Sequence, residues 1–128
     1  MAKFLTAEWL AEITTTVNQN DAFTSAIAAV DLTLQFEIPD APEGTEGIYH
    51  LAIKDGALET GAGAADEPDA TITHDYETAV AISQGTLNTQ MAFMTGKMKV
   101  AGNMAKIMMN QMVFTKFAEA ASAVEVEY

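Results

Sequence analysis

The sequence predicts an α+β fold for residues 1–128, taken as one domain, with helices grouped at both ends of a run of strands. Three observations support this prediction. Apolar and polar residues alternate from Leu32 to Ile38, as in a strand with one buried and one solvated face. Asp55-Gly56 is a strong signal for a two-residue hairpin turn. Helical spacing of apolar residues precedes and follows these segments, which indicates grouped rather than alternating elements.

Two helices are expected before the first strand. Thr6 can cap the first helix, and Glu8 lies near its positive end, where the helix dipole favours an acid. Its apolar side chains recur on one face, namely Trp9, Leu10, Ile13 and Val17. After a break at 18–21, the apolar spacing from Phe23 to Val30 indicates a second, short helix.

The strands are expected to follow one another closely after the first, with a turn cluster at 39–44. Ile48 to Lys54 alternates again, and the hairpin turn at Asp55-Gly56 returns the chain along Ala57 to Gly61. Another loop spans 63–68, and Ala70 to His74 reads as a short fourth strand. Connections of this length favour antiparallel neighbours.

Helical spacing resumes at Asp75. This residue can cap a helix that Gly85 ends, because glycine adopts the left-handed conformation common after a helix. Either Thr86 or Asn88 can cap a second short helix, which would end at Gly96.

A late strand and a final helix complete the expected order of elements. Residues alternate from Lys97 to Ala101, which predicts a fifth strand. Gly102-Asn103 then breaks the strand and caps one long helix from Met104 to about Ala121. The acidic end, Glu125 to Tyr128, is interpreted as a tail.

Composition narrows the functional classes. The chain has 128 residues and 49% hydrophobic residues, enough for the core of one globular domain. The absence of cysteine excludes disulfides, thiol nucleophiles and thiolate metal sites, and it favours a cytoplasmic location. The N-terminal segment carries acidic and polar residues every few positions, unlike a signal peptide. The longest uncharged run, Thr78 to Gly96, contains serine, asparagine and glutamine, so no transmembrane helix is expected.

Charge is strongly segregated along the chain. The net charge is −12, which repels nucleic acid and anionic bilayers, and there is no arginine to clamp a phosphate. Residues 78–118 nevertheless contain no acid and four of the six lysines, while the rest of the chain carries −16 from eighteen acids and two lysines. The same window holds seven of the eight methionines, whose soft side chains can re-pack around apolar shapes. This window is therefore the first place to look for function.

No catalytic or metal-binding motif stands out. His50 and His74 lie in predicted strands without metal-ligand spacing, although His74-Asp75 is the best candidate for an acid–base pair. Ser25, Ser83 and Ser122 lack the context of a nucleophile elbow. The acids between 66 and 69 read as solvated loop residues. We therefore expect no enzyme, no metal and no cofactor.

The final predicted helix is apolar around much of its circumference. Met104, Ile107, Met108 and Met112 follow one side, and Met109, Val113 and Phe117 a second. One side can pack on the sheet, while the other needs a second protein layer, a partner or a ligand. The residues alone leave an ordinary second core layer and a ligand cavity equally open.

Several short motifs follow one another between Asp69 and Met112. They are DATIT at 69–73 followed by Asp75, a short helix to Gly85, AFMTGKMKV at 92–100 and GNM at 102–104. With these landmarks the segment resembles the sterol carrier protein 2 (SCP-2) lipid-binding family. Each motif is short, but their order and spacing are specific. The upstream helix, the alternating strand and the Asp55-Gly56 hairpin follow the same order.

The resemblance implies an SCP-2-like α+β fold, with a five-stranded, mostly antiparallel sheet covered by helices that enclose an apolar cavity. It implies non-enzymatic binding, and possible transfer, of a sterol, fatty acid or acyl chain. The positions that match its ligand site are Leu34, Phe36, Phe93, Met94, Met98, Val100, Met104, Ile107, Met108 and Met112. Without arginine, the chain is poorly equipped for the phosphates of a CoA head group.

Two interpretations compete with a lipid carrier. A dimerising interaction module would bury the late helix against a second copy and bind no ligand. An enzyme would need His50 or His74 in a cleft beside a carboxylate.

Lys97, Lys99 and Lys106 could meet a lipid carboxylate or approach an anionic surface, while the acidic remainder prevents tight adhesion. Stable insertion into a membrane is not expected.

Overall fold

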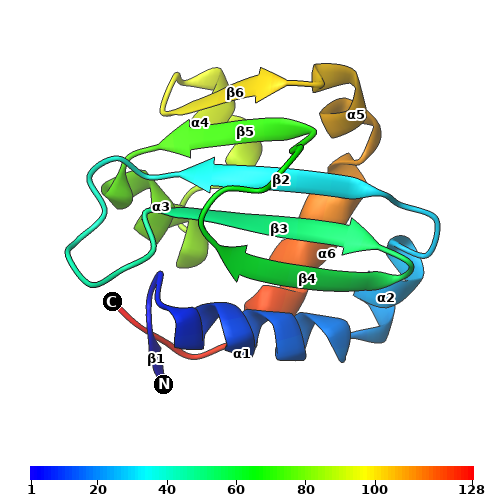
Figure 1. The fold of residues 1–128 in the computed structure, drawn as a ribbon, viewed down its shortest axis with the longest axis horizontal. Coiled ribbons are helices and arrows are strands. Elements are labelled where there is room, and N and C mark those ends of the chain that lie inside the picture. Colours follow the sequence, from blue (N-terminus) through cyan, green and yellow to red (C-terminus); the bar gives the residue numbers. More distant parts are fainter.

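The computed structural model describes all residues from Met1 to Tyr128. A five-stranded mixed sheet has the order β4-β3-β2-β5-β6, drawn from bottom to top in Figure 1. Its strands are β2 (Leu32–Glu37), β3 (Ile48–Lys54), β4 (Ala57–Ala62), β5 (Ala70–His74) and β6 (Met98–Gly102). Only the pairing of β2 with β5 is parallel, so the predicted, mostly antiparallel sheet is confirmed.

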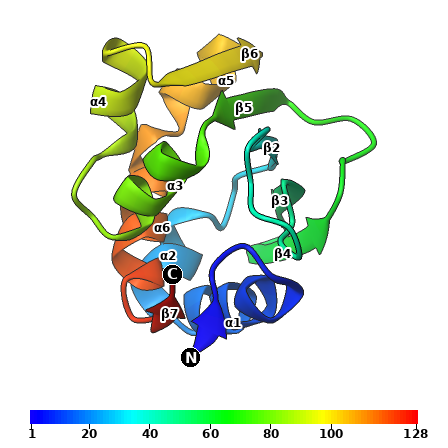
Figure 2. The same cartoon turned by 90° about the vertical axis from the view of Figure 1, so that its left-hand side faces the viewer.

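The chain also forms six helices. They are α1 (Ala7–Asn18), α2 (Asp21–Ala26), α3 (Tyr76–Ser83), α4 (Thr89–Met94), α5 (Met104–Met109) and α6 (Gln111–Ala121). Figure 2 shows α3, α4 and α6 on one side of the sheet, with α1 below its β4 edge. No helix combines the length and the apolar composition needed to cross a membrane.

Short polar side chains fix where most helices begin. The predicted caps Thr6, Asp75, Asn88 and Asn103 each accept a hydrogen bond from the backbone N–H three residues later, and Asn20 does the same for α2. Such caps satisfy N–H groups that have no partner within the helix. These helix starts are confirmed because they depend on neighbours in the sequence.

The prediction of one long final helix is wrong. The helix is interrupted at Asn110, whose backbone departs from helical values with φ −113° and ψ 25°. The Asn110 side chain donates to the carbonyl oxygen of Lys106 at 2.8 Å. Such a local bond competes with the helical hydrogen bonds of the backbone. The chain therefore turns between α5 and α6, and the methionines on either side of the break no longer follow one helical stripe.

The acidic end is not the free tail that the sequence predicts. Residues Val126–Glu127 form β7, which pairs in parallel with β1 (Ala2–Lys3). The Tyr128 ring lies 5.2 Å from the ring of Phe4, and its hydroxyl hydrogen-bonds with Ser83. Both ends of the chain therefore meet beside α1 (Figure 1).

The interior divides into two apolar clusters. The larger contains seventeen buried residues and is organised around aromatic contacts. Within it Trp9 meets Tyr49 edge-on at 5.8 Å, and the half-buried Phe36 stacks on Tyr49 at 5.0 Å. The second cluster has only six buried residues, namely Leu32, Leu34, Ala70, Ile72, Ala92 and Met98. It lies where the methionine-rich segment meets the sheet.

Candidate functional site

An apolar row crosses the part of the sheet that bears the second cluster. Backbone pairing sets Phe36 opposite Ile72, and Ile72 opposite Val100. Paired residues on neighbouring strands point to the same face, so these three side chains lie next to one another. Ile72 is buried, while Phe36 and Val100 are only half-buried. The row is therefore an apolar surface that protein atoms leave partly uncovered.

Four helices close over this row. Ala92 of α4 is fully buried in the second cluster. Half-buried side chains pack around it, namely Ile82 of α3, Ile107 of α5 and Phe114 of α6. In Figure 2 the helices stand opposite β2 and β5. The layer between sheet and helices is thus apolar on both sides, with few fully enclosed side chains.

The helices of this layer carry an unusual amount of exposed apolar surface. Nine large apolar side chains of the chain are exposed, and six of them lie on α4, α5 and α6. These six are defined as the methionine face: Met91, Phe93, Met94, Met108, Met109 and Met112. Met109 is the most exposed of them at 83%. Exposed apolar patches on a small protein are typical of binding surfaces.

The ten residues predicted to contact a ligand fall into two groups. Leu34, Phe36, Met98, Val100 and Ile107 meet in the second cluster, and Met104 is half-buried at the start of α5. The other four belong to the methionine face, with exposures of 41% for Phe93, 76% for Met94, 65% for Met108 and 63% for Met112. The structure brings the first group together and leaves the second facing solvent. Their role as ligand contacts stays a prediction.

Two residues at the centre of the layer are not among the ten predicted ligand contacts. Ile72 lies between Phe36 and Val100 in the sheet, and Phe114 reaches the cluster from α6. The alternation in the strand from Ala70 to His74 could have indicated Ile72. Phe114 extends the second apolar side of the predicted final helix, so helical spacing was a local signal for it.

An acid directly before β5 links α5 to the sheet. The carboxylate of Asp69 accepts from the backbone N–H of Thr33 at 2.8 Å and pairs with Lys106 of α5 at 3.1 Å. Its carbonyl oxygen accepts from the N–H of Asn103, the cap of α5. The expectation that Asp69 is a solvated loop residue is therefore wrong. Lys106, half-buried in this ion pair, is not free to receive a lipid carboxylate.

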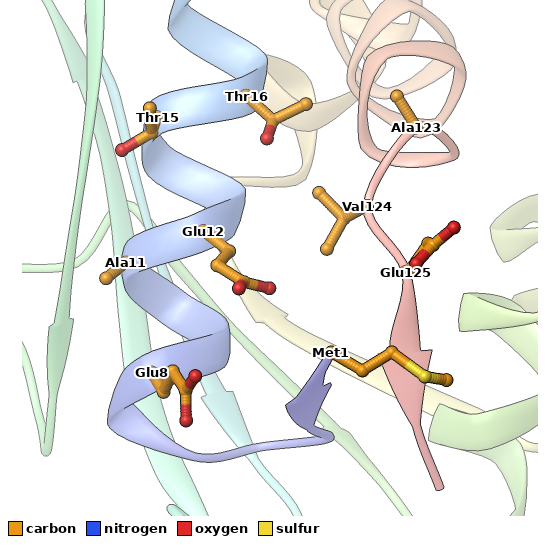
Figure 3. A pocket seen from close by; sticks show the side chains of 9 residues that line it. All are labelled: Met1, Glu8, Ala11, Glu12, Thr15, Thr16, Ala123, Val124 and Glu125. Atoms are coloured by element: carbon orange, nitrogen blue, oxygen red, sulfur yellow. The ribbon is translucent and has the colours of Figure 1, made fainter.

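Two hollows of the molecule lie outside this layer. One of about 480 Å³ lies between α1 and the end of the chain, where Glu8, Glu12 and Glu125 give it acidic walls (Figure 3). A second of about 150 Å³ lies beside α3 and includes Asp75 and Lys97. None of the ten predicted ligand residues lines either hollow. Acidic walls disfavour an apolar tail, since carboxylates lose hydration when covered.

Both histidine rings pack against or lie beside backbone atoms of the fold. His50 Nδ1 lies 2.9 Å from the carbonyl oxygen of Gly63, and the His50 ring fills the space that a Cβ on Gly61 would occupy. His74 is buried beside Met98 in the sheet, and its Nδ1 lies 3.2 Å from the carbonyl oxygen of Asp75. The Asp75 carboxylate caps α3 by accepting from Thr78, which lowers the pKa of Asp75. The anticipated His74–Asp75 pair therefore consists of a buried ring and a helix cap.

His74 gives the fold a predicted pH dependence. Burial lowers the pKa of His74 below its ordinary value of 6.5, although Asp75 and Asp40 oppose the shift. The unfolded chain then takes up a proton at higher pH than the folded chain does. The free energy of unfolding should therefore fall as the pH drops below about 6.5.

Urea unfolding at about pH 7 and about pH 5 checks this expectation. His74→Gln, which cannot protonate, should reduce the difference between the two unfolding midpoints. Equal differences in the variant and in the unaltered protein would contradict the role of His74. The contribution of Asp75 belongs to a separate window below its ordinary pKa of 3.8, because a lowered carboxyl pKa stabilises the fold only above it.

Comparison with known proteins connects this architecture to one family. The model of the SCP-2 sterol transfer family matches residues 12–115. Sterol carrier protein 2 of Gallus gallus is 34% identical over 73 residues, which are 57% of this chain but only 13% of that relative. The matched region thus spans a small part of a much longer protein.

Two solved structures show the same fold at lower sequence identity. A solution structure of a Thermus thermophilus protein has a TM-score of 0.80 at 19% identity and covers 99% of this chain and 93% of its own. A crystal structure of sterol carrier protein 2 has a TM-score of 0.77, also at 19% identity, and covers 96% of this chain and all of its own. Both likenesses extend over nearly the whole molecule, so the similarity is one of complete folds.

Proposed function

Because the chain belongs to the SCP-2 sterol transfer family, we propose that it binds one lipid molecule without catalysing a reaction, in the layer between the sheet and α4–α6. The observation that carries the proposal is the half-covered apolar row of Phe36, Ile72 and Val100 beneath methionine-rich helices. The six buried residues of the second cluster form the floor of this site. The half-buried side chains around the cluster still have exposed apolar surface, which a bound ligand would cover.

Methionine is suited to such a site. Its unbranched side chain turns at three bonds and adapts to an apolar shape at little strain. Met98 is already buried, while Met94, Met108 and Met112 are exposed and free to move inward around a ligand. A ligand that draws them inward removes apolar surface from water twice, on the ligand and on the protein. The ten predicted residues are proposed as the contacts in this bound state.

Burial of an alkyl chain gives useful affinity when most of the chain is covered. Each buried methylene contributes about 0.8 kcal/mol, so a chain of about a dozen contributes roughly 10 kcal/mol. Association costs about 4–15 kcal/mol in lost freedom, so affinity depends on nearly the whole chain being covered. A sterol satisfies the same requirement with a rigid body that loses less conformational freedom on binding.

The polar residues favour a ligand with a small head group. The chain has no arginine, and Lys106 is already paired with Asp69. A cluster of phosphates would therefore lack bidentate partners. We accordingly propose a free fatty acid or a sterol rather than an acyl-CoA, and transfer of that lipid between donors and acceptors.

Denaturing extraction of gently purified protein, followed by lipid mass spectrometry, tests the proposal. We expect one class of lipid at a stoichiometry near one per chain, with native mass spectrometry showing the complex intact. A fluorescent fatty acid should bind the delipidated protein and be displaced by the extracted lipid. A dimer that holds no lipid and binds no fluorescent fatty acid would reject this function and support the dimerising module instead.

A further inference from the structure

The hollow beside α3 borders the layer that we assign to the lipid. Six residues line this hollow, namely Asp75, Glu77, Thr78, Ala81, Leu87 and Lys97. One of them, Leu87, is half-buried and packs against the second cluster. Leu87 lies in the link between α3 and α4, two of the helices that close over the sheet. This side chain therefore adjoins both the polar hollow and the apolar layer.

The hollow carries charges of both signs. Asp75 caps α3, and Glu77 lies in the first turn of the same helix. Lys97 belongs to another part of the chain, directly before β6. Hydrogen bonds that Thr78 donates lower the pKa of Asp75, and the positive charge of Lys97 lowers it further. Asp75 and Lys97 form no salt bridge, so a carboxylate and an ammonium group line the same small space without pairing.

We propose that this hollow holds the head group of the bound lipid, and that the head group is an uncharged hydroxyl. A hydroxyl group can donate one hydrogen bond and accept others, so it can donate to the Asp75 carboxylate while it accepts from the Lys97 ammonium group. The tail of the lipid passes Leu87 and enters the apolar layer. This assignment rests on the proposed lipid binding, and it narrows the ligand to a hydroxyl-bearing lipid, either a sterol or a long-chain alcohol.

The size and the charge of the hollow disfavour other head groups. Its volume of about 150 Å³ is below the range of about 300–1,000 Å³ for sites that hold a whole drug-sized ligand, so it suits a head group alone. An ionised fatty acid would bring a third carboxylate beside Asp75 and Glu77, with only Lys97 to offset the repulsion. A phosphate ester meets the same repulsion. An uncharged hydroxyl avoids it and still uses both charges as hydrogen-bond partners.

Displacement of a fluorescent fatty acid from the delipidated full chain compares matched lipids. Hexadecanol is expected to bind about tenfold more tightly than its methyl ether, because the ether cannot donate to Asp75 and one hydrogen bond to a charged group accounts for about that factor. The ether is the more apolar of the two, so a purely apolar site would favour the ether. Cholesterol and its methyl ether form a second arm, and the alcohol that binds more tightly identifies the class of ligand.

Lys97→Met tests whether the hollow is the place of the head group, and Lys99→Met is its matched control. Both variants remove one exposed positive charge. Lys99 does not line the hollow, and alternation along β6 places it on the sheet face away from the helices. Lys97→Met should weaken hexadecanol binding about tenfold, while Lys99→Met should leave it unchanged. Circular dichroism should show both variants folded.

The acids of the hollow are tested with hexadecanoate, the carboxylate of the same chain length. Glu77→Gln should strengthen hexadecanoate binding roughly threefold by removing a repulsion between exposed charges, and it should not change hexadecanol binding. Glu12→Gln is the control, because it removes an acid that lines the other hollow. It should change the binding of neither lipid.

Two results would overturn this assignment and leave the proposed function intact. One is tighter binding of the methyl ether or of hexadecanoate than of hexadecanol, which would reject a hydroxyl head group. The other is an equal effect of Lys97→Met and Lys99→Met on hexadecanol binding, which would place the head group outside the hollow. If the chain instead binds no fluorescent fatty acid and none of these lipids, the proposed function fails, and the assignment of the head group fails with it.

Discussion

Replacing Gly102 with alanine is expected to lower the free energy of unfolding by about 3 kcal/mol or more. Gly102 has φ +119°, a region that side-chain-bearing residues rarely adopt. A Cβ there would lie 2.5 Å from the carbonyl oxygen of Asp69 and 2.8 Å from Cα of Ala70. These are backbone atoms of a paired strand, so they cannot move aside as a flexible side chain would. Strain and overpacking each cost about 1–3 kcal/mol.

Gly56→Ala is the matched control for this substitution. Gly56 also has a positive φ, +77°, but a Cβ there would meet no atom within 4 Å. Gly56→Ala should therefore lower the free energy of unfolding only by the cost of the left-handed conformation, about 1–2 kcal/mol. Urea unfolding of both variants measures the difference. Equal losses would show that Gly102 is required for its backbone conformation alone and that the close approach to Asp69 is tolerated.

The substitution at Gly102 should also weaken lipid binding in protein that remains folded. Gly102 ends β6 and is followed by Asn103, whose N–H donates to Asp69 and whose side chain caps α5. A shift here moves α5 relative to the sheet, and with it Ile107 above the second cluster. Titration with a fluorescent fatty acid at a temperature where the variant is folded would detect this effect.

Val100→Trp is expected to reduce lipid affinity at least tenfold while changing the free energy of unfolding by less than about 1 kcal/mol. Val100 is half-buried at the end of the apolar row and lies on an edge strand, so an indole can enter the layer that we assign to the ligand. Displacing two or three methylenes of the ligand is enough for this loss, at about 0.8 kcal/mol each.

The neighbouring residue supplies the control. Ala101 is exposed and points to the opposite face of β6, so Ala101→Trp adds the same side chain outside the layer. Fatty-acid titration and thermal unfolding should separate the two variants. Should Val100→Trp instead bind lipid normally and unfold easily, the layer would be filled by protein side chains, and the ligand site proposed between sheet and helices would be wrong.

Local chemistry accounts for the parts of the fold that the sequence predicted well. The caps at Thr6, Asp75, Asn88 and Asn103 act within three residues, and they are correct. The strand from Ala70 to His74 was predicted to the residue, because alternation is visible along the chain itself. The Asp55-Gly56 turn joins β3 to β4 with positive φ at both residues, as its sequence demands.

Contacts between segments that are distant in the sequence account for the features of the fold that the sequence did not predict. The parallel pairing of β2 with β5 depends on the crossover through β3 and β4, which no local pattern specifies. The pairing of β1 with β7 joins the two ends of the chain. The break between α5 and α6 lies at a single residue, Asn110. The apolar residues on either side of it keep helical spacing, so the pattern predicts one continuous helix.

The sequence by itself determined that methionine and lysine concentrate between residues 78 and 118, and that this segment resembles a lipid-binding family. Only the tertiary structure decided which of those methionines are buried and which form an exposed face. Met98 is 7% exposed and Met109 is 83% exposed, although both belong to the same apolar segment. The reason is that the burial of a side chain depends on the neighbours that the fold brings against it. The composition of a segment shows only that apolar side chains are present, which would stabilise the fold if they were buried.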